Sequence, residues 1–408
     1  MSEAIPPEVV SSATSTAGGE PAAPLRACFV PFFHQNPYQR ELARNLAACG
    51  VQVSAQPGLK GVIRDVVLRR GAPRLIHLHW LPRVSRTPRG LFQLALFVVR
   101  LYTLRFLGRR IVWTAHNLYP HDVGGYFLER WLTRRVIAWS TCIIAHSPSA
   151  AELVGAEFGP RARRKLNVIP HGNYIGAYPN TLSRADARAR LGLPPQATVF
   201  LFLGNIRPYK GVNELIRAFR QLRAPESVLV VAGKPFHESA VAELQEATGG
   251  DPRILLRPGY VPDADIQVYM NAADAVVFPY QDILTSGAVV LAMSFGRACI
   301  APTIGCIPDM LDGRGAFLYS PAAPAALEAA LQRACDQRDT LDTMGAHNIK
   351  TAAQWGWDVI AAQTARVYRQ AFSTAHRIEI PATHSHEKVL AQASGRPAAP
   401  ERFPDQPN

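Results

Sequence analysis

The chain has few cysteines and no long hydrophobic run. Its six cysteines in 408 residues are scattered without C-x-x-C spacing, so a disulfide-stapled domain or a zinc ribbon is not expected. We expect free thiols, most of them buried, in a reducing cytosol. No apolar run reaches the roughly 20 residues that cross a bilayer, and the N-terminus lacks the charged and then apolar pattern of a signal peptide. These absences predict a cytoplasmic protein without a membrane span.

Acidic residues are scarce in the first part of the chain. Residues 26–165 contain 22 lysines and arginines but only six acidic residues, a net charge of +16; the whole chain carries +13, which leaves −3 for the rest. Such a basic region predicts an anionic partner. Nucleic acid is not expected, because no nucleic-acid-binding motif is present and the arginines are spread over many segments. An anionic membrane surface is another candidate, and solubility alone is the alternative.

Short apolar runs alternate with helical segments along the chain, and 48% of the residues are hydrophobic. This pattern predicts an α/β protein with two cores. The ends, 1–24 and 376–408, are rich in small, polar and proline residues, and we expect them to be disordered tails. Two domains are expected between them, at 25–180 and 190–350, with Ile175–Leu191 as the segment that links them.

One segment, Leu91–Leu107, is strongly apolar but is interrupted by Gln93, Arg100 and Arg105. We expect a buried helix of the first domain. An amphipathic helix that faces a membrane is the alternative, because of the basic charge around it.

A strand, a capped helix and a second strand follow one another in the second half. Ala275–Pro279 and Ala298–Ala301 read as strands, and the helix between them begins at Gly287 and stops at Gly296. Thr285 and Ser286 can cap this helix. A glycine at a helix start lets a ligand approach the backbone, and the unpaired N–H groups there attract phosphate.

A cationic loop precedes this unit. The strand that starts at Val199 leads into a loop with Arg207 and Lys210, and an amphipathic helix follows from Val212 to Leu222. The planar fork of an arginine and the point charge of a lysine both suit a diphosphate. Two solvated surface cations are the alternative. We favour the diphosphate because the capped helix lies in the same domain.

Polar and aromatic side chains follow three predicted strands of the first domain. The loop after 26–33, at the edge where α/β proteins bind ligands, offers His34, Asn36 and Tyr38 as contacts for an acceptor or a phosphate. Helix capping alone also explains Asn36. The strand 75–80 places His77 and His79 on one face and ends in Trp80, which can stack on a sugar or simply pack. Packing or substrate contact is the favoured role of the two histidines, not zinc binding.

The strongest candidate site of the first domain is the segment 110–122. An apolar strand there ends in a loop with His116, Asn117, His121 and Asp122, an unusual density of titratable groups. A later strand ends at His171, which we place at the interdomain cleft. Two aspartates, Asp263 and Asp265, flank Ala264. A helix cap explains this acidic pair better than a metal site does, so no metal and no cofactor are expected.

The second domain resembles the GT-B glycosyltransferases with two Rossmann-like domains, in particular the family with an E-x7-E signature. The matching residues are Gly204–Gly211, Ala273–Val276, Pro279, Leu291–Gly296 and Gly305–Asp309. The resemblance implies an α/β GT-B fold, two Rossmann-like domains facing across a cleft, and a closing helix at 351–373 that crosses back to the first domain.

The same resemblance assigns the donor site. It implies that Arg207, Lys210, Thr285, Ser286 and Gly287 hold the donor diphosphate. Contacts to the donor nucleoside or sugar are implied for five further residues: Gly204, Tyr260, Val261, Tyr280 and Asp282. Both signature glutamates are missing, because their positions hold Ile283 and Leu291.

The wider pattern, N-P-Y, H-L-H-W, H-N-L-x-P-H-D, R-P-Y-K-G and T-S-G, resembles bacterial exopolysaccharide mannosyltransferases of the xanthan type more closely. It implies transfer of a sugar from GDP-mannose or a UDP-sugar to a polyprenyl-diphosphate-linked or saccharide acceptor, at the inner face of the membrane. Inversion is slightly favoured over retention, with Asp122 and then His116 as the base. A degenerate nucleotide-sugar-binding protein and a nucleotide-sugar epimerase are the alternatives.

Overall fold

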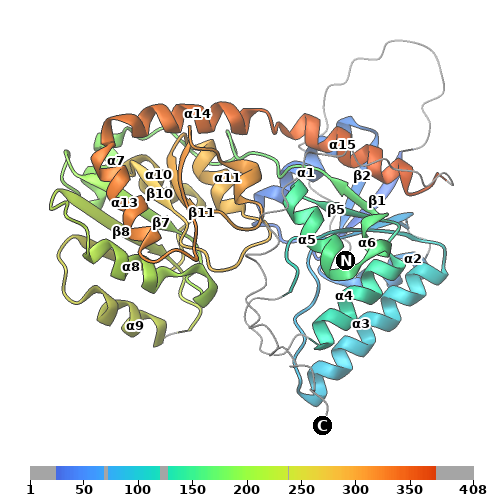
Figure 1. Cartoon of the computed structure of the whole chain (residues 1–408). Coiled ribbons are helices and arrows are strands. Elements are labelled where there is room, and N and C mark those ends of the chain that lie inside the picture. Colours follow the sequence, from blue (N-terminus) through green and yellow to red (C-terminus); the bar gives the residue numbers. More distant parts are fainter. Residues whose placement is uncertain (1–23, 69–71, 120–126, 238, 374–408) are drawn as a thin grey trace, which may run out of the picture. The chain divides into compact units, whose positions relative to one another are not determined.

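A computed structural model describes residues 24–68, 72–119, 127–237 and 239–373 of the chain (Figure 1). Two separate six-stranded parallel sheets, each built with helices, follow one another in the sequence. This is the α/β architecture that the sequence predicts. His121, Asp122 and both predicted tails lie outside the described residues, apart from residue 24.

The first sheet has the strand order β2-β1-β3-β4-β5-β6. Its strands are β1 (Leu25–Val30), β2 (Val51–Ala55), β3 (Leu75–Leu78), β4 (Arg110–Thr114), β5 (Cys142–Ala145) and β6 (Leu166–Val168). The helices of this part are α1 (Pro37–Ala48), α2 (Leu59–Val67), α3 (Pro88–Phe106), α4 (Phe127–Trp139), α5 (Pro148–Phe158) and α6 (Pro160–Arg163). Polar side chains set two of the helix starts: Asn36 accepts from the N–H of Tyr38 at 3.0 Å, and Ser147 accepts from the N–H of Ala150 at 3.1 Å.

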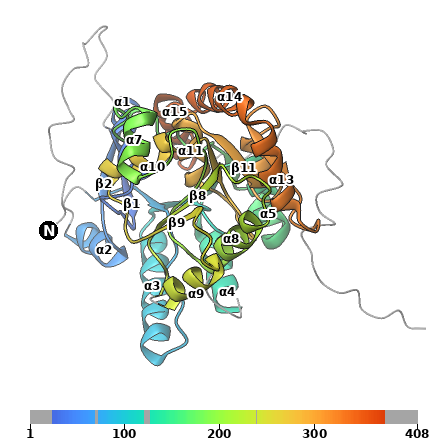
Figure 2. The ribbon, with the colours of Figure 1, turned by 90° about the vertical axis from the view of Figure 1, so that its left-hand side faces the viewer.

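The second sheet has the strand order β12-β11-β10-β7-β8-β9. Its strands are β7 (Thr198–Leu203), β8 (Ser227–Gly233), β9 (Ile254–Pro258), β10 (Ala275–Val277), β11 (Ala298–Pro302) and β12 (Ala316–Tyr319). Its helices are α7 (Arg184–Leu191), α8 (Val212–Arg220), α9 (Ser239–Thr248), α10 (Ile266–Ala272), α11 (Gly287–Ser294), α12 (Ile307–Met310), α13 (Ala326–Asp336) and α14 (Leu341–Ala353). Short 3₁₀ turns occupy Pro208–Lys210, Asp263–Asp265 and Arg338–Thr340. Figure 2 shows α8 and α9 side by side.

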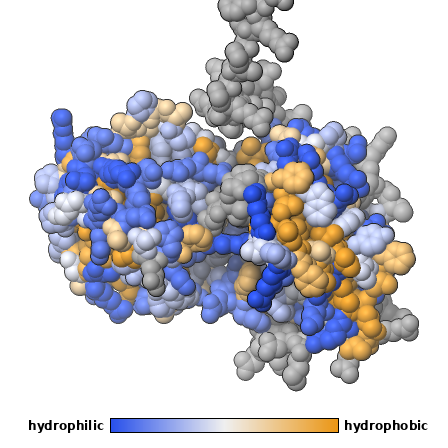
Figure 3. All heavy atoms as spheres, turned by 90° about the horizontal axis from the view of Figure 1, so that it is seen from below, coloured by the Kyte–Doolittle hydropathy of each residue, from blue (hydrophilic) through white to orange (hydrophobic). Residues whose placement is uncertain are grey.

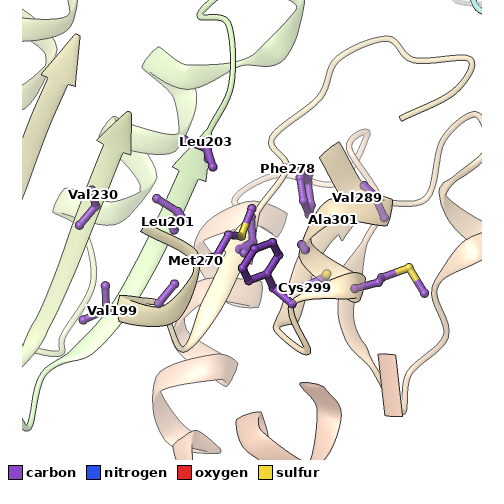
Figure 4. Packing of buried hydrophobic residues seen from close by; sticks show 14 of the residues in the cluster. Val199, Leu201, Leu203, Val230, Met270, Phe278, Val289, Cys299 and Ala301 are labelled. Atoms are coloured by element: carbon purple, nitrogen blue, oxygen red, sulfur yellow. The ribbon is translucent and has the colours of Figure 1, made fainter. Parts of the chain in front are cut away.

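Each sheet is covered by apolar side chains on both faces. Figure 4 shows one cluster of the second sheet, in which Val199, Leu201 and Val230 pack with Phe278 and Met270. Side chains that point to the other face of the same strands, such as Phe200 and Phe202, belong to a different cluster. This two-sided burial explains why the strands read as nearly continuous apolar runs.

The last helix, α15 (Trp357–Gln370), packs against the first sheet although it follows the second sheet in sequence. It lies beside α1 (Figure 1), and its Ile360 and Tyr368 share a cluster with Phe29 and Leu42. Tyr368 is fully buried, and its hydroxyl lies 2.6 Å from Nδ1 of His77. The crossing helix implied by the resemblance is therefore present over these residues.

Three local expectations need correction. The Leu91–Leu107 segment forms most of α3, but several of its apolar side chains are exposed, so it is not a buried helix. Asp265 precedes α10 without any side-chain capping bond, so capping does not explain the acidic pair. Arg184–Leu191, expected within the linking segment, is helix α7, and its Arg188 donates to a carboxylate oxygen of Asp274 at 2.8 Å.

Candidate active site

Each sheet has a topological switch point, where the connections that leave two neighbouring strands run in opposite directions along the sheet. In the second sheet it lies between β7 and β10, and in the first between β1 and β3. Ligands of parallel α/β proteins bind in the crevice that opens there, beyond the carboxyl ends of the strands. The predicted cationic loop follows β7, and the predicted capped helix α11 follows β10. The fold therefore brings these two sequence predictions together at one edge.

The loops after β7 and β10 are in direct contact. The backbone N–H of Gln281 donates to the carbonyl of Tyr209 at 2.8 Å. Gly211 adopts φ +64°, and a Cβ there would come within 2.0 Å of the Pro279 carbonyl oxygen. Any other residue at 211 would push the two loops apart, so this glycine fixes their spacing.

Lys210 is the central cation of the cationic loop. Its Nζ lies 5.9 Å from the ring centres of both Phe202 and Tyr280, and only 3.1 Å from where a Cβ on Gly204 would stand. Burial, and then the nearby Arg207, lower the pKa of Lys210 from 10.5 to about 8. A bound anion would raise this pKa again, because it favours the charged form of the lysine. Lys210 is therefore suited to contact a negatively charged ligand.

Helix α11 begins at the same edge. Ser286 caps it by accepting from the N–H of Val289 at 3.3 Å. A Cβ on Gly287 would stand 3.2 Å from the Tyr174 hydroxyl and 3.5 Å from Nε2 of His171, so the helix start faces these side chains closely. The first N–H groups of a helix have no partner within the helix and carry partial positive charge. The start of α11 is therefore suited to an anion.

Thr285 does not cap α11 as predicted. Its hydroxyl donates to the backbone carbonyl of His116 at 2.9 Å. His116 follows β4 of the first sheet, so this hydrogen bond joins the α11 start to the first sheet's site.

Four strands of the first sheet are followed within three residues by a histidine at one edge: His79 after β3, His116 after β4, His146 after β5 and His171 after β6. The rings form a row, with centres 5.8 Å apart from His79 to His116 and 5.2 Å apart at each of the next two steps. Tyr38 is buried against all four rings. The predicted acceptor residues Tyr38 and His171 thus lie in one cluster with His116.

These histidines are neutral at physiological pH. Burial lowers the pKa of His146 to about 4 and that of His171 to about 3, and it lowers the pKa of His79 and His116 well below 6.5. Neighbouring histidines add to the effect at His79, His116 and His171. Within the described residues, both ring nitrogens of His79 and the Nε2 atoms of His116 and His146 are buried without a hydrogen-bond partner. A polar ligand could satisfy them.

His77 is different. Its two ring nitrogens bond Tyr368 at 2.6 Å and the Thr114 hydroxyl at 2.7 Å, and its ring shares one face of β3 with His79 at a centre distance of 4.1 Å. Of the two roles that the sequence leaves open for this histidine, packing or substrate contact, these bonds fit packing.

A cavity of about 970 Å³ opens beside this row. Of the predicted residues, five line it: Asn36, Trp80, His116, Asn117 and Arg207. The ring of Trp80 stacks on His116 with centres 4.5 Å apart, which leaves an indole in the wall. Since its walls come from both halves of the chain, the cavity is shared between them.

The remaining predicted residues lie elsewhere. Tyr260 and Val261 line a separate pocket of about 310 Å³ near β9. His34 and Asp282 are exposed, and His34 stacks edge-on against Phe32. Ile283 packs in the hydrophobic core of the second sheet, and Leu291 packs against that core.

Two residues of the site have no counterpart in the sequence predictions. His146 directly follows an apolar strand, and His116 follows one after a single intervening residue. This position at the end of a strand was the sequence feature that could have identified His146. Glu129 has no comparable signal, because it looks like an ordinary helix residue. It is nevertheless 4% exposed and lines the cavity, and its Oε2 has no partner among the described residues.

No group of three or more histidine, cysteine, aspartate or glutamate side chains is arranged to hold a metal ion in the parts of the chain that the structure describes. All six cysteines are free thiols, as predicted from their spacing.

Comparison with known families and proteins agrees with this architecture. Residues 197–337 match the family described as Glycosyl transferases group 1, and residues 35–173 match Glycosyltransferase Family 4. A GDP-mannose:glycolipid 4-beta-D-mannosyltransferase of Xanthomonas campestris pv. campestris is 28% identical over 262 residues, which cover 62% of this chain and 69% of that protein. A D-inositol 3-phosphate glycosyltransferase of Streptomyces griseus subsp. griseus is 33% identical over 212 residues, 49% of this chain and 45% of that protein.

Solved structures share the fold at low identity. Sucrose-phosphate synthase from Thermosynechococcus elongatus superposes with a TM-score of 0.69 at 20% identity, covering 85% of this chain and 99% of that chain. Anabaena HepE, in complex with UDP and glucose, superposes with a TM-score of 0.67 at 17% identity, covering 85% and 100%.

Proposed function

Because this chain is a GT-B glycosyltransferase, we propose that it transfers a hexose from GDP-mannose or a UDP-sugar to a lipid-linked or saccharide acceptor. The acceptor would belong to cell-surface or exopolysaccharide synthesis, at the inner face of the membrane. The relatives named above support this choice, since one acts on GDP-mannose and a glycolipid and another is bound to UDP.

One set of contacts carries the proposal. The cationic loop with Arg207 and Lys210 contacts the loop that leads into α11, and the Tyr280 ring, 5.9 Å from Nζ of Lys210, places its hydroxyl 3.3 Å from that of Ser286. We infer from these contacts that the two cations and the helix start converge. Such a convergence suits a diphosphate, because each group stabilises negative charge from a different direction. The nearby Trp80, half-buried in the cavity wall, offers a flat apolar face for a sugar ring.

The chemistry follows from where charge develops. As the bond between the sugar C1 and the diphosphate oxygen breaks, negative charge grows on the leaving nucleoside diphosphate. Arg207, Lys210 and the N–H groups at Gly287 would stabilise that charge more in the transition state than in the bound donor.

An inverting transfer also needs a base for the acceptor hydroxyl. His116 is a poor base because burial keeps its pKa far below neutrality. As a neutral ring with an unpartnered Nε2, it suits a hydrogen bond to the donor sugar. Asp122 is our first choice as base, and Glu129 is the alternative carboxylate in the cavity wall.

The alternative is a degenerate protein that binds nucleotide sugars but has lost catalysis. By the register of the sequence resemblance, Ile283 and Leu291 stand where the resembling family has its two glutamates. Both side chains pack in or against the core and neither can accept a hydrogen bond from a sugar. A degenerate protein would bind nucleotide sugars without transfer.

A donor panel tests the proposal. Purified protein is mixed with labelled GDP-mannose and UDP-sugars and with lipid extracts, and labelled products are separated by mass. We expect transfer from one donor, and about a hundredfold lower turnover in Asp122→Asn with donor affinity unchanged. Glu129→Gln is the matched variant: if it alone loses turnover, Glu129 is the base. Donor binding without transfer to any extract would support the degenerate protein, and release of free sugar alone would support an epimerase-like enzyme.

A further inference from the structure

Helix α3 has a composition that a helix of a globular domain rarely has. Its residues Pro88–Phe106 contain three arginines, no acidic residue and a majority of apolar side chains. Thr87 caps it by accepting from the N–H of Gly90 at 3.2 Å. At 19 residues it is the longest helix of the described chain. No helix in the described ranges, α3 included, is long and apolar enough to cross a membrane.

Only one side of α3 is used for folding. Leu94, Leu101 and Leu104 are buried and belong to the cluster that covers one face of the first sheet. These positions recur at intervals of seven and three residues, as one face of a helix requires. The interior of the domain therefore explains these leucines, together with Phe97 and Val98, which pack against the same cluster.

A second side of α3 exposes an apolar row to solvent. We define the α3 apolar row as Leu91, Phe92, Val99, Tyr102 and Phe106, which are between 41% and 78% exposed. Phe127, at the start of the adjacent α4, is 77% exposed. Figure 3, which views the molecule from the side on which α3 lies, shows apolar side chains gathered in a band. Aromatic side chains of this exposure in one row mark an interaction surface.

Exposed basic side chains lie on α3 and on the adjacent α4. Arg89 is exposed on α3, and Arg134 and Arg135 are exposed on α4, whereas the exposed Arg130 is paired with Glu157 at 2.8 Å. With the +16 net charge of residues 26–165, they would repel the same surface of a second copy. They complement the anionic headgroups of a membrane, into which apolar and aromatic side chains insert.

A third side of α3 forms part of the wall of the 970 Å³ cavity. Gln93, Phe97 and Arg100 line it, and their spacing of four and three residues places them on one face. The same helix therefore separates the cavity from the α3 apolar row.

We propose that α3 docks the protein on an anionic membrane, with the α3 apolar row inserted at the level of the headgroups and the cavity opening beside them. A lipid-linked acceptor could then reach the cavity while its lipid tail stays in the bilayer. The delivery of such an acceptor rests on the proposed function, whereas the membrane contact does not.

Vesicle sedimentation tests the docking. The full chain is spun with vesicles of phosphatidylcholine alone, or of phosphatidylcholine and phosphatidylglycerol in equal parts. We expect strong sedimentation only with the anionic vesicles, weakened by high salt. The variant Phe92→Gln with Phe106→Gln should reduce the partition coefficient about tenfold or more, because two inserted aromatic rings are lost. Val359→Gln on α15, also an exposed apolar position, is the matched control and should change nothing.

Two further measurements on the same samples distinguish loss of membrane binding from loss of folding. Thermal unfolding shows whether the double variant is folded, and calorimetric titration with GDP and UDP shows whether its nucleotide site is intact. Equal sedimentation of wild type and double variant, or none of the wild type, would overturn the docking, while the proposed sugar transfer is judged separately by the donor panel. A wild type that is dimeric and a double variant that is monomeric would assign the row to a second copy and also overturn it.

Discussion

Lys210 is a side chain whose pKa the fold lowers while leaving it mostly charged at neutral pH. Its pKa of about 8 in the free protein lies near physiological pH, and a bound diphosphate would raise that pKa because it favours the charged form. Nucleotide binding should therefore be coupled to uptake of a proton on the alkaline side of neutrality.

The affinity for GDP or UDP should stay constant below about pH 8 and fall above it, by up to about tenfold per pH unit, because the free protein then loses the proton that the complex keeps. Titration calorimetry at about pH 7 and about pH 9 measures this. Lys210→Arg is the control, since arginine keeps its charge and should remove the dependence. An affinity that is the same at both pH values in the wild type would show that Lys210 does not face the diphosphate.

The residues of the site were predictable where local sequence decides their role. The caps Asn36 and Ser286 follow from their place before a helix, and the structure confirms both. Thr285 could not be predicted, because its partner, the His116 carbonyl, lies on the other sheet. Glu129 was missed for the same reason: its burial in the cavity wall depends on the tertiary fold.

At the scale of elements, α15 shows how a distant segment completes the first sheet. Its Trp357 donates to the carbonyl of Asn173 at 2.7 Å, and its Tyr368 hydroxyl bonds the buried ring of His77 at 2.6 Å. Removal of α15 would therefore open the first sheet's core as well as the edge that carries the histidine row.

Tyr368→Phe should lower the free energy of unfolding by about 1–3 kcal/mol, because Nδ1 of His77 would stay buried without a partner. Urea unfolding followed by circular dichroism measures the loss. Val359→Ala, an exposed position on the same helix, should change stability by less than about 0.5 kcal/mol. If both variants were equally stable, the hydrogen bond between α15 and the first sheet would contribute nothing.

The order and type of the elements followed from sequence periodicity, because strands buried on both faces read as apolar runs. Periodicity could not show which surface each helix face packs against. The apolar segment of α3 was expected to be buried, yet only one of its sides meets the core. Asp265 stands where a cap is expected, but its backbone is already helical, so its side chain makes no capping bond.

At the scale of the whole molecule, two switch points contribute to one candidate site. The second sheet supplies the cations and the helix start, and the first sheet supplies a row of neutral histidines and an indole. In the proposed transfer from a nucleoside diphosphate sugar, the cations would stabilise the leaving group and the neutral rings would contact the sugar. The basic charge of the first half is what we propose to favour the anionic membrane and the acceptor.

Calorimetric titration of GDP and of UDP into the wild type, Arg207→Ala and Arg217→Ala tests the diphosphate site most directly. Arg217 is exposed on α8 and lies outside the cationic loop, so Arg217→Ala removes one positive charge, as Arg207→Ala does, without touching that loop. We predict that the wild type and Arg217→Ala bind one of the nucleotides equally well, and that Arg207→Ala binds it about tenfold to a hundredfold more weakly, because a charge-assisted contact is lost. Binding of neither nucleotide, or equal binding by all three proteins, would contradict the account.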